Sequence, residues 1–259
     1  MIGILYMIII LIANTIGSIS GMGGGVIIKP MLDFINIHSP KEISFFSSLA
    51  VFTMSIISTR TQIKNNNSFS WNMIFKIAIG SILGGILGQY TYTYLLIMTN
   101  NENYITIIQV ILTIISLLFS YLHSMNIWEN FKLHNTISYL LCGLLLGFLA
   151  SFLGIGGGPI NVSLLMLMFN FPIKRATTYS ICIIFFSQLS KLVTFFITSS
   201  LIDIDISMIP FIIFAALIGG KLGAVISNKI SENKIKYLFK IIILFVIFIN
   251  IYNAYQILS

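Results

Sequence analysis

The chain has 259 residues, of which 57% are hydrophobic and only 8% are charged, and its net charge is +7. A soluble domain carries roughly 25% charged residues, so these few charges cannot cover a water-soluble globule. This composition excludes a disordered chain, a disulfide-rich secreted module and a soluble enzyme. We therefore expect an all-α polytopic membrane protein, a multi-pass chain of the cell membrane. The basic residues lie mostly in short loops, as membrane orientation requires, and we expect no nucleic-acid partner.

Eight long apolar runs follow one another along the chain, each close to the roughly 20 residues that a helix needs to cross the hydrocarbon core. They lie at about 2–20, 42–62, 72–98, 104–122, 136–153, 174–200, 207–227 and 235–257. Two shorter apolar stretches, about 26–36 and 159–170, follow the first and fifth runs and are too short to cross alone. The length of the runs favours helices over a barrel, whose strands alternate every second residue.

Two glycine patterns occur twice, at nearly the same spacing. The run Gly21–Gly25 recurs as Gly154–Gly158. The pattern Gly84–Gly88 recurs as Gly219–Gly223. Because both spacings are close to half the chain length, the sequence predicts a duplicated unit of four spans.

We place the two repeats at residues 1–125 and 126–259, within a single integral membrane domain. Four crossings per half favour parallel repeats, since inverted repeats need an odd number. The short stretches after the glycine runs could be re-entrant, which leaves the count open. Cytoplasmic loops are rich in lysine and arginine, and four crossings per half place both termini outside. The predicted cytoplasmic set is Lys41, Lys174, Arg175, Lys229, Lys234 and Lys236, and the opposite set is Arg60, Lys64 and Lys132.

The repeated glycine runs indicate a break in each half, because glycine costs about 1 kcal/mol relative to alanine within a helix. Unwound backbone at membrane depth is tolerated only where protein or a water-filled cavity satisfies it. We expect a fresh helix to start near Val26 and near Pro159, since proline is favoured as the first residue of a helix. A helix N-terminus offers free N–H groups and a partial positive charge, so two such ends could bind one small anion near the midplane. Glycines at four-residue spacing, such as Gly80, Gly84 and Gly88, indicate close helix packing instead.

The pattern Gly-x-Gly-Gly-Gly-x-Ile-x-x-Pro, present as Gly21 to Pro30 with an echo at Gly154 to Pro159, resembles the TauE/SafE sulfite exporter family. The resemblance covers nearly the whole chain and includes a lysine-containing link, at Lys41 and Lys174, before a span rich in serine and threonine. It implies export or uptake of small sulfur-containing anions such as sulfite or sulfonates, without ATP hydrolysis. The second half departs from the pattern, because Ser163 stands where Pro30 has its counterpart.

Ionisable groups inside spans are costly and therefore point to function. Lys191 lies deep in the sixth run beside Gln188, and this polar cluster is the best candidate for a cationic partner to an anion. Lys29 and Asp33 are four residues apart and can simply pair with each other on one helix face. The predicted substrate-binding residues are Gly23, Gly24, Gly25, Gly156, Gly157, Gly158, Pro159, Gln188 and Lys191.

These residues predict a secondary transporter or facilitator for a small anion, with a proton as the candidate coupling ion and the lipid bilayer as its surroundings. The alternative is a non-transporting membrane subunit that binds a partner, although the chain has no long exposed loop of the kind such a role needs. A membrane enzyme would need paired acids, bases or metal ligands, and the sequence offers none at suitable spacing, so neither an enzyme nor a cofactor is expected. Cys142 and Cys182 sit among apolar neighbours and are expected to act as small hydrophobic residues.

Overall fold

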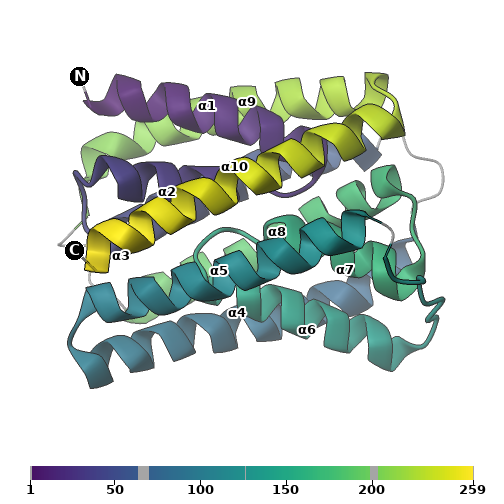
Figure 1. Ribbon diagram of the computed structural model, residues 1–259, viewed down its shortest axis with the longest axis horizontal. Coiled ribbons are helices and arrows are strands. Elements are labelled where there is room, and N and C mark those ends of the chain that lie inside the picture. The colour runs from purple at the N-terminus through teal and green to yellow at the C-terminus, as the bar shows by residue number, and fades with distance from the viewer. Residues whose placement is uncertain (1, 64–69, 126, 199–203, 259) are drawn as a thin grey trace.

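The computed structural model describes residues 2–63, 70–125, 127–198 and 204–258, and these residues form helices with no β-strand among them. The long helices lie roughly side by side, with α1 and α9 along one edge and α4 and α6 along the opposite edge (Figure 1). The elements are α1 (Ile2–Ser20), α2 (Gly25–Ile35), α3 (Pro40–Ile63), α4 (Trp71–Thr99), α5 (Glu102–Ser124), α6 (Thr136–Phe152), α7 (Pro159–Phe169), α8 (Ile173–Thr198), a short 3-10 helix (Ile206–Met208), α9 (Ile209–Lys229) and α10 (Glu232–Leu258).

The helices match the apolar runs of the sequence closely. Seven described helices are long and apolar enough to cross a membrane, and α6 is a shorter apolar helix of 17 residues. The two short stretches form α2 and α7, each of 11 residues. The prediction of an all-helical, multi-span membrane protein is therefore confirmed.

The first glycine run turns the chain back on itself, so α1 and α2 form a hairpin. The backbone after α1 reverses, and Gly24 packs against Asn14 in the middle of α1. The hydroxyl of Tyr6, near the start of α1, lies 2.8 Å from Nδ1 of His38, which follows α2. Both ends of the hairpin consequently lie at the same end of the molecule.

The second glycine run forms the same kind of hairpin from α6 and α7. The connection before α6 donates backbone hydrogen bonds to the end of α7, from Phe131 to the carbonyl of Leu167 and from Leu133 to that of Met168. The rings of Tyr139, in the first turn of α6, and Phe169, at the end of α7, are 5.0 Å apart. This hairpin therefore also returns to the end at which it started.

Three long helices per half then run from one end of the molecule to the other: α3, α4 and α5 in the first half, and α8, α9 and α10 in the second. Because three is odd, the two halves run in opposite directions, and both termini lie at one end (Figure 1). The parallel arrangement that the sequence favoured is wrong, since it counted each glycine-broken segment as a net crossing. The two-repeat organisation itself stays a prediction.

We call the end that holds both termini the terminal end, and the opposite end, where α9 joins α10, the basic end. Lys41 lies at the terminal end together with Glu42, Glu102 and Asp205, so its predicted grouping with Lys174 is wrong. The first hairpin moves Lys41, Arg60 and Lys132 to the side opposite the predicted one, and the second hairpin restores the predicted side for the later connections. Lys64 lies outside the described residues. The described residues at the basic end include Arg60, Lys76, Lys132, Lys174, Arg175, Lys229, Lys234 and Lys236.

Glycines without side chains allow two pairs of helices to pack very closely, as the four-residue spacing predicted. On α4, a β-carbon at Gly80 or Gly84 would meet the backbone carbonyl of Leu140 or Leu144 on α6. A β-carbon at Gly223 on α9 would likewise meet backbone of α1. These contacts assign the spaced glycines to helix packing.

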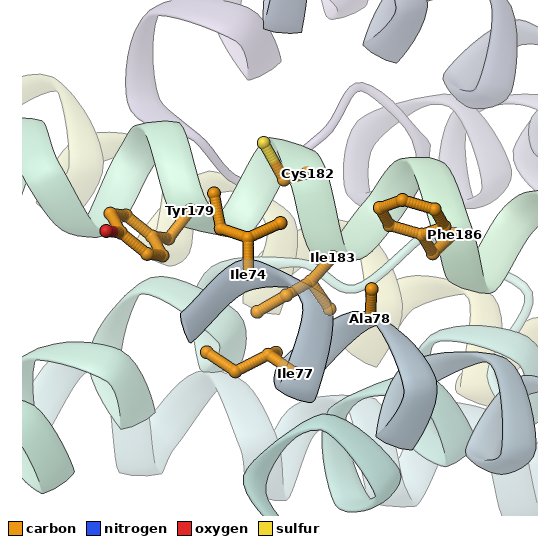
Figure 2. A pocket seen from close by; sticks show the side chains of 7 residues that line it. All are labelled: Ile74, Ile77, Ala78, Tyr179, Cys182, Ile183 and Phe186. Atoms are coloured by element: carbon orange, nitrogen blue, oxygen red, sulfur yellow. The ribbon is translucent and has the colours of Figure 1, made fainter. Parts of the chain in front are cut away.

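The contact between the first half of α4 and the first half of α8 is apolar and tightly filled. Figure 2 shows Ile74, Ile77 and Ala78 on α4 together with Ile183 and Phe186 on α8, and the space among them cannot hold a water molecule. Cys182 lies in the same contact and, like Cys142, is a buried free thiol. This interface is packing, and it holds α8 in place beside the glycine hairpins.

Candidate functional site

The glycine runs Gly21–Gly25 and Gly154–Gly158 form the tips of the first and second hairpin, and these tips meet in the interior of the protein. A β-carbon at Gly23 would lie 3.3 Å from the carbonyl oxygen of Gly156, and one at Gly25 would collide with the carbonyl of Ile155. Both tips are buried. The two glycine runs, which are far apart in the sequence, are thus brought together as predicted.

Two long helices hold the meeting point between them. Val51 of α3 and Ile184 of α8 both pack against Gly23, and both also contact the second tip. The same sequence offset relates these two positions as relates the two glycine runs. The tips also approach matched positions, Gly154 beside Ser44 and Gly21 beside Thr177.

The tips need glycine because of their backbone conformation. Gly23 and Gly156 have φ values of 73° and 70°, in the left-handed region that other residues adopt only with strain. In the second tip Gly157 and Gly158 also have positive φ. Without side chains the backbones of the two tips can approach each other directly.

Each tip leads into a new helix, which begins where the sequence predicted. In the first half α2 begins at Gly25, and the carbonyl of Gly24 accepts the N–H groups of Ile27 and Ile28. In the second half α7 begins at Pro159, which occupies the first turn. Both helices direct their N-terminal, partially positive ends toward the meeting point of the hairpins.

Several buried polar side chains around the tips have no hydrogen-bond partner among the described residues. They include Oδ1 of Asn14 and both amide atoms of Asn161 and of Gln188. Asn14 lies against Gly24, and Asn161 lies against Gly157. Buried polar groups are normally satisfied, so these atoms retain hydrogen-bonding capacity for water or a polar ligand.

Two lysines converge on the tip of the second hairpin. The Nζ of Lys191 donates to the hydroxyl of Ser44 at 2.9 Å. A β-carbon at Gly154 would lie 2.7 Å from that hydroxyl and 3.3 Å from Cε of Lys29. Lys29 in turn donates to Oε1 of Gln109 at 3.0 Å, so side chains of both halves meet here.

The two lysines differ in how their charge is balanced. Lys29 pairs with Asp33 at 3.5 Å, as the four-residue spacing predicted. Lys191 is only 3% exposed, and within the described part of the chain no carboxylate lies within 4.0 Å of its amine. A buried cation without a carboxylate partner is costly, and an anion bound nearby would offset that cost.

The predicted site residues fall into two groups, one at the meeting point of the tips and one on α8. The glycines of both runs surround the meeting point, and Pro159 starts the helix beside it. Gln188 lies one turn beyond Ile184 on α8, and Lys191 lies further toward the terminal end, beside the second tip. The sequence missed Lys29 as a member of this group, because only its pairing with Asp33 could be read from local spacing.

A polar cavity of about 210 Å³ opens at the terminal end and reaches Asp33. His38 also lines it, and its Nε2 lies 3.7 Å from a carboxylate oxygen of Asp205. Hydrogen bonds from the hydroxyl and the backbone N–H of Ser207 hold the pKa of Asp205 below its ordinary value. Asp205 therefore remains a carboxylate at lower pH than a free aspartate does. The cavity itself links solvent to the Lys29–Asp33 pair, because Asp33 lines it.

Comparison with known proteins places this chain among membrane transporters. Residues 6–250 match the family described as Sulfite exporter TauE/SafE. The chain is 28% identical to the probable membrane transporter protein YunE of Bacillus subtilis (strain 168) over 91% of this chain and 92% of that protein. It is 27% identical to the probable membrane transporter protein MJ0441 of Methanocaldococcus jannaschii over 90% of this chain and 89% of that protein. No solved structure matches the chain.

Proposed function

Because the chain belongs to the Sulfite exporter TauE/SafE family and is a membrane transporter, we propose that its cargo is a small sulfur-containing anion such as sulfite or a sulfonate. The anion binds where the two glycine hairpins meet. The observation that carries this proposal is the buried Lys191, which lies beside the second of the two apposed tips and has no carboxylate partner among the described residues.

The backbone and the side chains take different parts in binding. N–H groups at the starts of α2 and α7 bind oxyanions without a formal charge, so the anion is held weakly enough to leave again. Lys191 supplies the balancing charge, and the unpartnered amides of Gln188 and Asn161 donate hydrogen bonds to the anion oxygens. Sulfite and sulfonates present three oxygens, which suits several converging donors.

Transport follows from the opposite directions of the two halves. In this proposal the hairpins move against each other, so that the anion faces first one end and then the other. The excess of lysine and arginine at the basic end supports a cytoplasmic location for that end and outside locations for both termini.

A proton is the proposed coupling ion, and Asp33 is its proposed site. Asp33 lies on the wall of the terminal-end cavity and pairs with Lys29, which borders the second tip. Protonation of Asp33 frees the charge of Lys29 for the anion, so that proton and anion binding favour each other. His38 lines the same cavity and faces Tyr6 and Asp205.

Uptake of labelled sulfite by proteoliposomes tests the proposal, with sulfonate, sulfate and acetate as competitors. We expect saturable sulfite uptake that a Lys191→Met variant lowers at least tenfold. Lys221→Met is the matched control, because Lys221 also lies within a long helix but is exposed. Equal uptake by wild type and Lys191→Met would remove Lys191 from the site, and inhibition by acetate instead of sulfonate would overturn the substrate class.

A further inference from the structure

A second cavity, of about 370 Å³, opens at the basic end between the starts of α4, α6 and α8. Its lining includes Lys76 of α4, His134 from the connection before α6 and Arg175 of α8. Ser70, Asn72 and Asn170 add polar groups, and none of the described residues that line it is acidic. Three basic side chains from separate elements therefore face one small space.

Helix ends add to this positive charge. Ser70 is the N-cap residue of α4, Tyr139 lies in the first turn of α6, and Arg175 lies in the first turn of α8, so three helices begin at the cavity. None of these helices has an acidic residue in its first turn. Their partial positive charges are thus not balanced locally.

Arg175 is held in place, yet it keeps an unused donor. Its guanidinium carbon lies 4.3 Å from the ring centre of Phe171 and 5.5 Å from that of Tyr179. These aromatic faces position the planar group, while its Nε is buried and has no hydrogen-bond partner among the described residues. Arginine presents donors in a fork that suits oxyanions.

The cavity also lies close to the transport path. Two residues beyond Arg175 on α8, Thr177 packs against Gly21, and the hydroxyl of Ser180 donates to the carbonyl of Gly21 at 2.6 Å. Ser180 lies five positions beyond Arg175 on α8, which corresponds to roughly 7.5 Å along the helix axis. The cavity therefore sits about two helical turns or less from the tip of the first hairpin.

We propose that this cavity is a second oxyanion-binding site, separate from the hairpin tips, which collects the transported anion at the basic end before it moves inward. The identity of its anion rests on the proposed function, whereas the site itself does not. Arg175 is the principal ligand, Lys76 adds charge, and the three helix starts supply N–H groups. Because Lys76 also donates to the hydroxyl of Thr136 at 3.0 Å, it is expected to contribute less than Arg175.

Trp71, the first residue of α4, offers a direct optical test next to the cavity. A Trp128→Phe background leaves Trp71 as the sole tryptophan. In phospholipid-free detergent, titration with sulfite, sulfate or phosphate should change its fluorescence saturably. We expect Arg175→Gln to raise the apparent Kd at least tenfold and Lys76→Gln about threefold, while Lys132→Gln, exposed at the same end and outside the cavity, stays within twofold of the background.

Absence of a saturable response, or identical titrations of Arg175→Gln and the background, would overturn the site. A second set of titrations in nanodiscs with and without phosphatidylglycerol identifies the source of the oxyanion. A response to that lipid and none to free anions would assign the cavity to a headgroup and overturn its role in collecting substrate.

Flux measurements separate this inference from the proposed function. Arg175→Gln is expected to raise KM for sulfite entering from the basic end severalfold and to leave kcat near wild type. If the reconstituted protein moves no sulfur anion but Trp71 still reports binding, the proposed function fails and the site stands. If flux persists with an unchanged KM and no titration, the site fails and the function stands.

Discussion

A single methyl group at the first hairpin tip tests whether the apposed glycines form the substrate site. In Gly23→Ala the new methyl would lie 3.1 Å from Cδ1 of Ile184, 3.3 Å from the carbonyl oxygen of Gly156 and 3.4 Å from Cγ1 of Val51. The two side-chain ends can shift by a few tenths of an ångström, so the packing cost is small. The φ of 73° is the larger obstacle, because a left-handed backbone costs an L-residue about 1–2 kcal/mol.

That cost falls on the conformation in which the tips meet. Since about 1.4 kcal/mol corresponds to a factor of ten, 1–2 kcal/mol lowers the population of the binding-competent state roughly 5- to 30-fold. The apparent affinity for substrate falls by the same factor. We therefore expect KM for sulfite uptake in proteoliposomes to rise about 5- to 30-fold.

The matched control is Gly3→Ala, a buried glycine at the terminal end of α1, where the three atoms nearest to the new β-carbon all belong to the ring of Phe211, which is partly exposed and can shift. This variant should retain wild-type KM, and equal reconstituted amounts of both variants are verified by quantitative immunoblotting. A KM for Gly23→Ala within twofold of wild type would refute the assignment of the tips as the binding site.

Three further outcomes follow from the same geometry. Asp33→Asn should abolish the dependence of uptake on an imposed pH gradient, because Lys29 then has no titratable partner on α2; retention of that dependence would place coupling elsewhere. Asn161→Leu removes a buried amide that has no hydrogen-bond partner among the described residues, so it should raise the free energy of unfolding by about 1–3 kcal/mol and should also raise KM. A lower melting temperature would mean that the amide is satisfied in the wild type. In intact cells a membrane-impermeant maleimide should label Glu102→Cys and not Lys132→Cys, and the reverse pattern would invert the proposed orientation.

The sequence predicted the elements of this fold well, because each depends on local composition. Apolar run length located the helices, and the glycine runs located the starts of α2 at Gly25 and α7 at Pro159. The return of each hairpin could not be read in this way. Hydropathy gives only the length of an apolar segment, and α1 has 19 mostly apolar residues whether the chain crosses the membrane there or turns back. The contact between Tyr6 and His38, which are 32 residues apart in the sequence, shows that the chain turns back after α1.

The candidate site was predictable to the same extent. Repetition of the glycine runs indicated that the tips would meet, and a lysine within a span identified Lys191. Lys29 was assigned only to its helix neighbour Asp33, since its approach to Gly154 joins residues from the two halves of the chain. The basic cavity was missed for a similar reason: Lys76 and Arg175 come from separate helix starts, and only packing brings them together.

Charge is distributed unequally over the two halves of the chain. At the sequence offset that relates the glycine runs, Lys191 corresponds to Ser58, whose hydroxyl donates to the carbonyl of Gly220 at 3.0 Å, and Lys29 corresponds to the apolar Val162. The buried cations therefore lie beside the second tip, toward the terminal end, while Arg175 serves the basic end. In the proposed mechanism an anion crosses uncharged glycine backbone between these two positive regions. In the same mechanism the Lys29–Asp33 pair exchanges its proton with the terminal end through the cavity that Asp33 lines, and the gradients of proton and anion set the direction of net transport.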